Sequence, residues 1–367
     1  MNTTTPVLYN DEGFKLLNEF LNKTNYSKLF VLVDKNTKIF CLPLLDKYLK
    51  HPFDLIEIRN GESYKNLKTT QHIWEKLTTQ GADRQSILIN LGGGVVTDIG
   101  GFAAATFKRG IRFINIPTTV LGMVDAAIGG KTGVDFNGLK NQVGVFHNAI
   151  ALLINTEFLK TLEQRELASG LAEIIKYGFI DNPKLFEEIN KINPETIEIK
   201  SQIIKESATI KQKIVAQDPN EQNIRKTLNF GHTLGHAIET HFLSNPLEEQ
   251  LLHGEAVAIG MIMALHLSYQ TQKLSLNEVN KFSKLILRFY LKKKQNTHQN
   301  TSGLPQIDST DIDFIRELLK HDKKNHNGQI NFILLETIGE AKINCQVSND
   351  EIIKAITFYN KTILEIY

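Results

Sequence analysis

The first part of the chain alternates short apolar runs with helical patterns. Residues 28–34 (KLFVLVD) and 53–58 (FDLIEI) predict buried strands, and residues 65–80 predict a polar helix. Further along, SILINLGGG and RFINIP predict two more strands. Strands that alternate with helices are typical of βαβ units, so we expect a parallel sheet with flanking helices. Ligands of such sheets bind beyond the carboxyl ends of the strands, where this chain places glycines and an Asp.

From about residue 155 onward the pattern changes to long stretches of helical periodicity. These stretches cover residues 162–179, 197–216, 227–242 and 255–274. The sequence therefore predicts an α/β, Rossmann-like N-terminal domain over residues 1–155 and a mostly α-helical C-terminal domain over residues 156–367. Residues 292–303 (KKKQNTHQNTSG) are polar and predict a mobile surface loop, with nucleic-acid binding by their basic side chains as the alternative.

Length and charge narrow the choice of partners. A chain of 367 residues is long enough for two domains. Its 42 Lys and Arg residues nearly balance 40 Asp and Glu residues, which leaves a formal charge of +2. This balance argues against a surface that attracts nucleic acid or an anionic membrane. Any bound anion must therefore be held locally, by cations gathered at one site.

The cysteines and the N-terminus bear on the compartment. Cys41 and Cys345 lie far apart and neither belongs to a CxxC pair, so we expect neither a disulfide scaffold nor a thiolate zinc site. The first residues contain no basic stretch followed by an apolar run, and no stretch approaches the ~20 apolar residues that span a bilayer. We therefore expect no signal peptide, no membrane segment and a cytoplasmic location.

A glycine-rich turn follows the SILIN strand. Gly92, Gly93 and Gly94 precede VVTD, which ends at Asp98. Consecutive glycines allow backbone N–H groups to approach a pyrophosphate, and the following helix offers its positive N-terminal end. The spacing differs from the common GxGxxG fingerprint. The turn therefore indicates either a nucleotide site or only a tight connection, and its strand–turn–helix context favours the nucleotide.

Three histidines and a glutamate suggest a metal centre. His232 and His236 are four residues apart on a helical segment and share one face, and His253 opens another predicted helix. Glu173 supplies a carboxylate on an otherwise apolar helix face. Two His and one Glu are a familiar ligand set for catalytic zinc, whereas the alternative is packed or solvated side chains. Thr233 stands where an HExxH protease needs its Glu, which disfavours proteolysis.

Cations suited to an anionic substrate lie near these motifs. The segment GGKTGVDFNGLKN lacks the first glycine of a phosphate loop, because Asp125 occupies that place, so hydrolysis of a magnesium nucleotide is a weak alternative. Most lysines of a charge-balanced protein are solvated. Lysines beside glycines and beside suspected metal ligands nevertheless suit a phosphorylated, carboxylated small molecule. The candidate substrate-binding residues are these cations and the polar residues beside them, namely Lys131, Lys140, Asn141, Lys176, Lys211, Glu221, Arg225, Asn229, Lys323 and Lys324.

Taken together, these segments resemble the 3-dehydroquinate synthase family. The match covers about residues 60–335 and runs in the expected order through NGESYK, GGGVVTD, FKRG, IPTT, VDAAIGGKTGVD, LKN, LAEIIKYG, KTLNFGHTLGHAIE, LHGEAVAIGM and HDKKN. Each motif is weak by itself, but the ordered set is specific. Two segments look longer than is usual in the family, one between His236 and His253 and the other at residues 292–303.

The resemblance implies a Zn²⁺ or Co²⁺ site with Glu173, His232 and His253 as ligands, and it leaves His236 as an active-site group near the substrate. It also implies an NAD site in the N-terminal domain. The matching NAD-contacting positions are Glu62, Lys65, Gly94, Val95, Val96, Thr97, Asp98, Thr118, Thr119, Lys131, Lys140, Phe158, Leu159, Lys160 and Thr161.

Substrate contacts follow from the same resemblance. The phosphate is expected to meet Lys131, Asn141, Asn229 and either Lys323 or Lys324, with Arg109 reaching across from the partner subunit of a homodimer. The substrate carboxylate is expected at Lys211 and Arg225. Further active-site positions are Asp125, Lys176 and Glu221.

The implied activity converts 3-deoxy-D-arabino-heptulosonate 7-phosphate to 3-dehydroquinate and phosphate, in the shikimate pathway to aromatic amino acids. NAD is expected to be a recycled catalyst, because the hydride that it accepts returns within each cycle. Other sugar-phosphate cyclases, of the inosose or valiolone type, are the nearest alternative. A metal-dependent polyol dehydrogenase would consume NAD stoichiometrically. A non-catalytic nucleotide-binding regulator would have no need of the Glu, the histidines and the lysines together.

Overall fold

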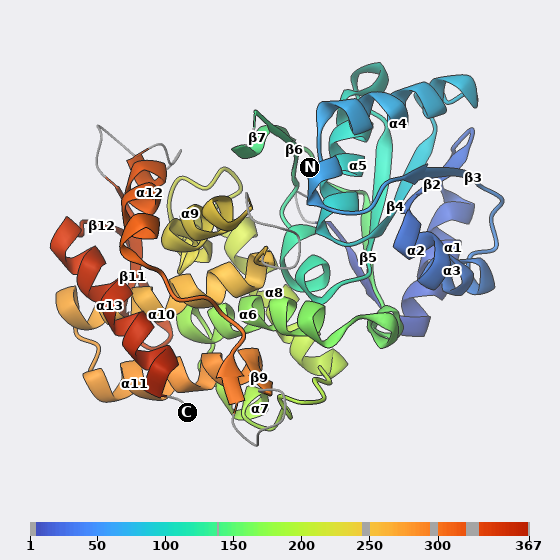
Figure 1. Cartoon of the computed structure of the whole chain (residues 1–367). Coiled ribbons are helices and arrows are strands. Elements are labelled where there is room, and N and C mark those ends of the chain that lie inside the picture. The colour runs from blue at the N-terminus through green and yellow to red at the C-terminus, as the bar shows by residue number, and fades with distance from the viewer. Residues whose placement is uncertain (1–4, 138, 244–249, 294–299, 321–329, 366–367) are drawn as a thin grey trace. The chain divides into compact units, whose positions relative to one another are not determined.

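We analysed a computed structural model of the chain, which describes residues 5–137, 139–243, 250–293, 300–320 and 330–365 (Figure 1). The chain divides into two compact units. Unit 1 comprises Met1–Glu163 and Lys211–Ala216, and unit 2 comprises Gln164–Ile210 and Gln217–Tyr367. Among the described helices, none is both long and apolar enough to cross a membrane.

Unit 1 is built on a six-stranded sheet in which all neighbouring strands are parallel. The order across the sheet is β1 (Val7–Tyr9), β8 (Ala151–Ile154), β5 (Arg112–Pro117), β4 (Ile87–Gly92), β2 (Leu29–Asp34) and β3 (Asp54–Ile58). The four strands predicted from the apolar runs are confirmed. The sheet and its flanking helices also confirm the predicted Rossmann-like α/β fold.

Helices pack on the sheet through apolar faces. They are α1 (Asn10–Lys23), α2 (Lys35–Phe40), α3 (Leu42–Tyr48), α4 (Leu67–Thr79) and α5 (Gly94–Thr106). Phe30 and Leu32 of β2 share one core with Ile73 of α4 and Ile99 of α5. Because side chains alternate along a strand, Val31 between them is buried on the opposite face of the sheet. The predicted polar helix at residues 65–80 is α4.

The strand order indicates where unit 1 binds ligands. From β2 the chain continues to β3, its neighbour toward one edge of the sheet. From β4 it continues to β5, its neighbour toward the opposite edge. The direction of the connections therefore reverses between β2 and β4. Open α/β sheets bind ligands at such a switch point, beyond the carboxyl ends of the strands. The glycine turn at Gly92–Gly94 follows β4 directly and leads into α5.

Short elements complete unit 1. They are η1 (Glu62–Tyr64), η2 (Phe107–Arg109), the π-helical turn η3 (Gly122–Ala126), the antiparallel hairpin β6 (Lys131–Phe136) and β7 (Leu139–Phe146), and η4 (Thr156–Thr161). The hairpin strands approach closely at Gly133 and Gly144, where a Cβ on Gly144 would lie 2.4 Å from the backbone oxygen of Thr132. The lysine-bearing segment GGKTGVDFNGLKN thus forms most of a β-hairpin.

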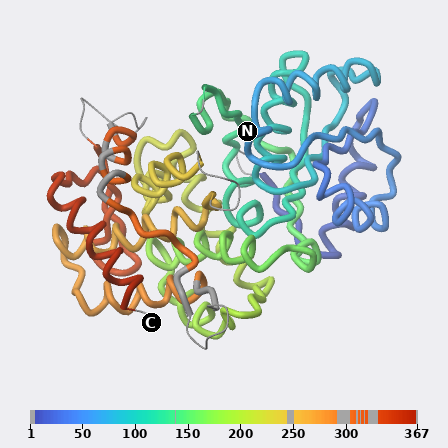
Figure 2. The backbone as a smooth tube through the Cα atoms, viewed as in Figure 1, coloured from blue at the N-terminus to red at the C-terminus, as the bar shows by residue number. Residues whose placement is uncertain are grey.

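Unit 2 is mostly helical, as predicted (Figure 2). Its helices are α6 (Gln164–Ile180), α7 (Leu185–Ile189), most of α8 (Ser201–Gln217), η5 (Ile224–Asn229), α9 (His232–Phe242), α10 (His253–Thr271), α11 (Leu276–Leu287), η7 (Arg288–Tyr290), α12 (Ser309–Lys320) and α13 (Asn349–Glu365). Two antiparallel hairpins accompany them, β9 (Leu291–Lys293) with β10 (Asn300–Ser302) and β11 (Phe332–Thr337) with β12 (Glu340–Cys345). Helix α10 is buried along almost its whole length and forms the core of the unit.

Two sequence predictions for this half were wrong in detail. The helix predicted over residues 227–242 is interrupted, because η5 ends at Asn229 and Gly231 adopts a left-handed conformation with φ +77° before α9 begins. The surface loop predicted at residues 292–303 begins and ends in the paired strands β9 and β10. Residues 294–299 lie outside the described part of the chain.

Candidate active site

Glycines bring α9 and α10 into close contact. A Cβ on Gly260 would lie 2.0 Å from the backbone oxygen of Gly231, and one on Gly235 would lie 3.1 Å from the backbone oxygen of Ala256. Side chains larger than hydrogen at these places would separate the two helices. The glycines of FGHTLGH and AIGM therefore allow the histidines of one helix to reach the histidine of the other.

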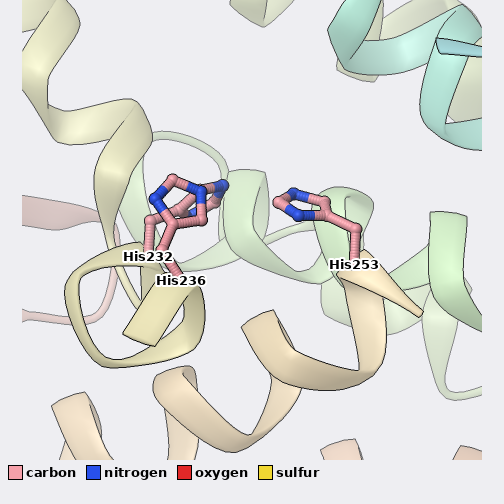
Figure 3. Close-up of side chains that lie close together, drawn as sticks. All are labelled: His232, His236 and His253. Atoms are coloured by element: carbon pink, nitrogen blue, oxygen red, sulfur yellow. The ribbon is translucent and has the colours of Figure 1, made fainter. Parts of the chain in front are cut away.

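Three histidine rings meet at this contact (Figure 3). Ligand atoms of His232, His236 and His253 all lie within 4.8 Å of one another, close enough to share a metal ion. The ring centroids are 5.2 Å apart for His232 and His236 and 5.5 Å apart for His232 and His253. His232 is the first residue of α9 and His253 the first of α10. The spacing argument was therefore right to place His232 and His236 on one helix face.

Glu173 of α6 faces two of these rings. Its Oε1 lies 3.3 Å from Nε2 of His232 and 3.6 Å from Nε2 of His253. The carboxylate is fully buried and forms an ion pair with Lys176, one turn further along α6. Burial opposes ionisation, but the Lys176 ammonium and His232 hold the pKa of Glu173 well below its usual value. Glu173 is therefore an anion inside the protein.

The hydrogen-bond partners of Nδ1 show how the rings of His232 and His253 are oriented. Nδ1 of His232 lies 3.0 Å from the backbone oxygen of Phe230, and Nδ1 of His253 lies 3.2 Å from Oε2 of Glu239. Both partners are acceptors, so each neutral ring carries its proton on Nδ1 and directs the lone pair of Nε2 toward Glu173. Two lone pairs and a carboxylate converge, which is the donor set that a divalent cation requires.

Without a metal ion, a second proton on His253 can supply the positive charge that faces Glu173 and Glu239. Burial disfavours charge on His253, but Glu239 and Glu173 outweigh it and raise the pKa of His253 to about 10. Burial and the nearby Lys176 lower the pKa of His232. Both oxygens of Glu173 are buried, with Lys176 beside Oε2 and the Nε2 atoms of His232 and His253 beside Oε1. The residues present therefore fit a divalent metal.

The start of α10 is anchored on both sides of His253. Glu255 caps the helix by accepting a hydrogen bond from the backbone N–H of Leu252. The same carboxylate forms an ion pair with Arg165, with Nε of Arg165 2.7 Å from Oε1 of Glu255. Gly254 donates its backbone N–H to Oγ of Ser169, one turn before Glu173. A Cβ on Gly254 would lie 1.9 Å from the backbone oxygen of Ser169. The HGE motif thus combines a candidate ligand, a close contact and a helix cap.

A carboxylate organises the loop that leads to α9. Asp218 accepts hydrogen bonds from the backbone N–H groups of Gln222 at 2.9 Å, Asn223 at 2.6 Å and Arg225 at 3.0 Å. Arg225 is buried and donates in turn to the backbone oxygen of Pro219. The loop therefore holds a buried guanidinium in a fixed place.

Two more predicted substrate contacts meet in the same loop. Nδ2 of Asn229 donates to Oε1 of Glu221 at 2.8 Å. Glu221 has a left-handed backbone with φ +58°, an uncommon conformation for a residue other than glycine. The structure thus brings Glu221, Arg225 and Asn229 together in one segment of unit 2.

In unit 1, the glycine turn lies beside the end of β5. The backbone N–H of Thr118 donates to the oxygen of Gly92 at 3.0 Å, and a Cβ on Gly93 would lie 3.0 Å from the side chain of Thr119. The predicted nucleotide contacts Gly94, Val95, Val96, Thr97 and Asp98 form the first turn of α5. The helix start, the glycines and the two threonines therefore share one end of the sheet.

A chain of polar contacts connects α5 to the β6–β7 hairpin. Nζ of Lys65 lies 2.6 Å from Oδ2 of Asp98 and 2.6 Å from Oδ1 of Asn141. Burial disfavours charge on Lys65, but Asp98 and Glu62 reverse this effect and raise the pKa of Lys65. Lys140 of the hairpin pairs with Glu62 at 3.4 Å. Five predicted contacts of nucleotide or phosphate are thus neighbours.

The remaining predicted nucleotide contacts lie in η4 and at the start of β6. Phe158 packs edge-on against Phe14, 6.4 Å between ring centroids, and Lys160 pairs with Glu157. Leu159 is buried, and Thr161 ends η4. Lys131 is exposed at the start of β6.

Arg109 lies in an exposed turn of unit 1, with left-handed φ values of +51° at Lys108 and +69° at Arg109. Nζ of Lys211 lies 2.7 Å from Oδ1 of Asp125, also in unit 1. Lys323 and Lys324 lie outside the described residues.

Sequence reasoning missed several residues that support the site. Glu239 is three residues after His236 and seven after His232, a helical spacing that could have shown it beside the ligands. Asp218 is followed by Pro at the end of α8, a usual signal for an Asx-type turn. Asp135 accepts from the backbone N–H of Asn141 at 2.7 Å, but nothing in its sequence context distinguishes it.

Comparison with known proteins extends over the whole site. The family models described as 3-dehydroquinate synthase N-terminal and C-terminal match residues 55–169 and 170–325. A 3-dehydroquinate synthase of Parabacteroides distasonis is 42% identical over 353 residues, which cover 94% of this chain and 95% of that protein.

Solved structures share the fold. A 2-epi-5-epi-valiolone synthase from Streptomyces hygroscopicus, with NAD⁺ and Zn²⁺ bound, is 26% identical and superposes with a TM-score of 0.85 over 98% of both chains. A 2-deoxy-scyllo-inosose synthase, 22% identical, superposes with a TM-score of 0.80 over 95% of both chains. The two family models match adjoining segments of the chain, and the 42% identical relative matches it over nearly the full length of both proteins. The chain therefore belongs to the 3-dehydroquinate synthase family.

Proposed function

We propose that this chain is a 3-dehydroquinate synthase, which converts 3-deoxy-D-arabino-heptulosonate 7-phosphate to 3-dehydroquinate and phosphate in the shikimate pathway. One observation carries the proposal. The buried carboxylate of Glu173 meets Nε2 of His232 and Nε2 of His253 in a chain that is 42% identical to a 3-dehydroquinate synthase over nearly its whole length. The enzyme is thus a phosphate-eliminating lyase.

Glu173, His232 and His253 are the proposed ligands of Zn²⁺ or Co²⁺. The related valiolone synthase contains Zn²⁺ and the inosose synthase contains Co²⁺. We prefer this set to the three histidines because both of its imidazoles have Nδ1 held by an acceptor and Nε2 facing Glu173. Lys176 balances part of the negative charge that Glu173 introduces into the interior. His236 then stands beside the ligands as a hydrogen-bonding group for the substrate.

NAD is the proposed second cofactor, as in the valiolone synthase. The start of α5 and the neighbouring Thr118 and Thr119 are suited to the pyrophosphate of NAD. Glu62, Lys65 and Lys140 are suited to other polar groups of the nucleotide. When bound, the metal supplies Lewis acidity and NAD supplies reversible acceptance of a hydride. The protein itself fixes cations and donors in place before the substrate arrives, so little reorganisation is needed during the reaction.

The substrate carries a phosphate and a carboxylate, and the chain offers cations for both. Lys211 and Arg225, each buried and hydrogen-bonded within its own unit, are the proposed contacts of the carboxylate. Asn141, Asn229, Lys131 and either Lys323 or Lys324 are the proposed contacts of the phosphate. Asp125 and Glu221 are proposed to orient Lys211 and Asn229, to which they are already bonded.

Three further assignments complete the proposal. Most of the nucleotide contacts are assigned to the N-terminal domain over residues 1–155, and the metal ligands and most of the substrate contacts to residues 156–367. The functional form is a homodimer in which Arg109 of one subunit contacts the phosphate of its partner. The location is the cytoplasm.

Phosphate release from three substrates tests the function. Purified protein with Zn²⁺ and catalytic NAD should release phosphate from 3-deoxy-D-arabino-heptulosonate 7-phosphate with no lasting rise in NADH absorbance. Sedoheptulose 7-phosphate and glucose 6-phosphate lack the carboxylate and should give little product, because they offer no anion to the buried cations Lys211 and Arg225. Preference for a neutral sugar would move the chain to the valiolone or inosose synthases. One NADH per product would make it a dehydrogenase.

A further inference from the structure

We propose that Glu239 is the positioning residue for the metal ligand His253, and that its carboxylate sets the metal affinity of the site. This inference rests on the proposed function, since it takes His253 as a ligand. Glu239 is neither a candidate ligand nor a substrate contact. Its role would be exerted entirely through the imidazole that it holds.

The geometry places Glu239 behind His253. Glu239 lies on α9, two turns after His232, and its side chain is 2% exposed. Oε2 of Glu239 lies 3.2 Å from Nδ1 of His253, whereas Nε2 of the same ring faces Oε1 of Glu173 at 3.6 Å. The imidazole is therefore held between two buried carboxylates, one on each nitrogen.

A carboxylate behind an imidazole has two effects on a metal ligand. It keeps the ring proton on Nδ1, which leaves the Nε2 lone pair available, and it fixes the plane of the ring. A full negative charge also makes Nε2 a stronger donor and offsets part of the charge of a divalent ion in the interior. His232 is held by a backbone oxygen instead, which supplies the first effect without the charge. Glu239 therefore contributes a property that the other imidazole ligand lacks.

Burying Glu239 would be costly without a function of this kind. An isolated carboxylate in the interior is strongly unfavourable unless it is paired and hydrogen-bonded. His253 is on a different helix from Glu239, so the contact is not part of the ordinary hydrogen bonding of α9. A leucine at position 239 would suit an apolar helix face better. The pairing across α9 and α10 therefore offsets part of the cost of burying Glu239 and fixes His253 from a second helix.

The chain provides a matched control pair on the same helix. Nε2 of His241, two residues after Glu239, lies 2.5 Å from Oδ1 of Asp311 on α12. This pair is also a histidine and a partly buried carboxylate that join α9 to another helix. It contains no residue of the proposed metal site. Asp311→Asn removes a carboxylate charge from a histidine in the same way as Glu239→Gln does.

The experiment measures Zn²⁺ affinity by competition with a chromophoric chelator, without NAD or substrate. Glu239→Leu removes acceptor and charge and should weaken Zn²⁺ binding by about 10–100-fold. Glu239→Gln keeps an acceptor of the same shape and should weaken it less. Asp311→Asn should leave the affinity unchanged. Thermal unfolding of the metal-free proteins shows whether Glu239→Leu folds, and Glu239→Gln preserves the test if it does not.

Substitutions of the proposed ligands give the reference for complete loss, because Glu173→Gln and His253→Ala should each abolish tight Zn²⁺ binding. Thermal unfolding of metal-free Glu239→Gln, compared with that of Asp311→Asn, separates the role of Glu239 from general damage to the fold. If Glu173→Gln and His253→Ala lose Zn²⁺ but both Glu239 variants retain the affinity of the unmutated protein, the inference is wrong and the proposed metal site stands. If Glu173→Gln and His253→Ala also retain it, the metal site fails, and the inference fails with it.

Discussion

Nζ of Lys211 donates two hydrogen bonds to Asp125, one of 2.7 Å to Oδ1 and one of 2.7 Å to the backbone oxygen. Lys211 is 7% exposed, so this ammonium is largely removed from water, and Asp125 holds it in place. Asp125 itself lies in the π-helical turn η3, which places its carbonyl and carboxylate on the same side. The cation proposed to bind the substrate carboxylate is thus positioned before any substrate is present.

Replacing Lys211 should weaken use of the acid substrate. Lys211→Met removes the cation and leaves the Asp125 carboxylate without this partner. We expect kcat/KM for 3-deoxy-D-arabino-heptulosonate 7-phosphate to fall by roughly 30- to 5,000-fold, which corresponds to about 2–5 kcal/mol for a broken buried charge pair. Lys213→Met, an exposed position on the same helix, is the control and should retain full activity. A normal kcat/KM for Lys211→Met would remove Lys211 from the proposed carboxylate site.

Substitutions of two histidines should distinguish the two possible ligand sets. Three imidazoles lie within 4.8 Å of one another, so proximity alone allows His236 to be a ligand. We expect His232→Ala to lose bound Zn²⁺, because a catalytic site with three protein ligands has none to spare. His236→Ala should keep one Zn²⁺ per chain in an elemental assay and lose much of its activity. Equal loss of metal in both variants would show that the histidines form the ligand set.

The fold could be predicted largely because its signals are local. The strand β4 and the glycines after it show their structure in a few consecutive residues, since a buried run followed by a tight turn has few alternatives. The break between η5 and α9 could not be predicted in this way. It depends on Gly231 meeting Met261 and Gly260 of α10, a contact between segments some 30 residues apart. The helical periodicity of the sequence continues through this break and therefore does not reveal it.

The candidate site was predicted in part. His232 and His236 could be paired from their spacing, but the position of Glu173 beside them follows from packing of α6 against α10 at Ser169 and Gly254. The family resemblance supplied that grouping, whereas the residues alone did not. Supporting carboxylates were missed for the same reason. Glu239 and Asp218 act on groups in other turns or helices, and their sequence neighbours do not reveal those partners.

Gly254→Ala should damage the metal site through packing. The added Cβ would lie 1.9 Å from the backbone oxygen of Ser169, which cannot move aside as a side chain can. Helix α10 must shift away from α6, and His253 moves with it. We expect a loss of about 1–3 kcal/mol in the free energy of unfolding by denaturant, together with weaker Zn²⁺ binding.

Gly61→Ala is the contrast for Gly254→Ala. A Cβ at this position meets nothing within 4 Å, but its φ of +105° is strained for any residue except glycine. It should therefore also cost about 1–3 kcal/mol of stability. Because Gly61 lies in unit 1, its substitution should leave Zn²⁺ affinity unchanged. Equal Zn²⁺ affinity in the two variants would mean that the close contact at Gly254 does not position His253.

The last prediction concerns acid stability. Burial would raise the pKa of Asp218, but the backbone N–H groups of Gln222, Asn223 and Arg225 outweigh it and lower that pKa. A group whose pKa is lower in the folded than in the unfolded protein stabilises the fold above its unfolded value, about 3.9 for Asp, and loses this effect as pH falls through the folded value. The carboxylate of Asp218 should therefore stabilise the protein at pH 7 and contribute progressively less below about pH 4.

Asp218→Asn should show this dependence in thermal unfolding. At pH 7 the variant should have a lower Tm than the unmutated protein, because an amide oxygen cannot replace both carboxylate oxygens as acceptors for three N–H groups. The difference in Tm should shrink as pH falls below about 4, where the unmutated protein begins to lose the same charge. Asp46→Asn, at an exposed position of α3, is the control and should differ little in Tm at any pH. A difference for Asp218→Asn that stays constant from pH 7 to acid would show that shape rather than charge makes Asp218 important, and that the Arg225 loop is held without its carboxylate.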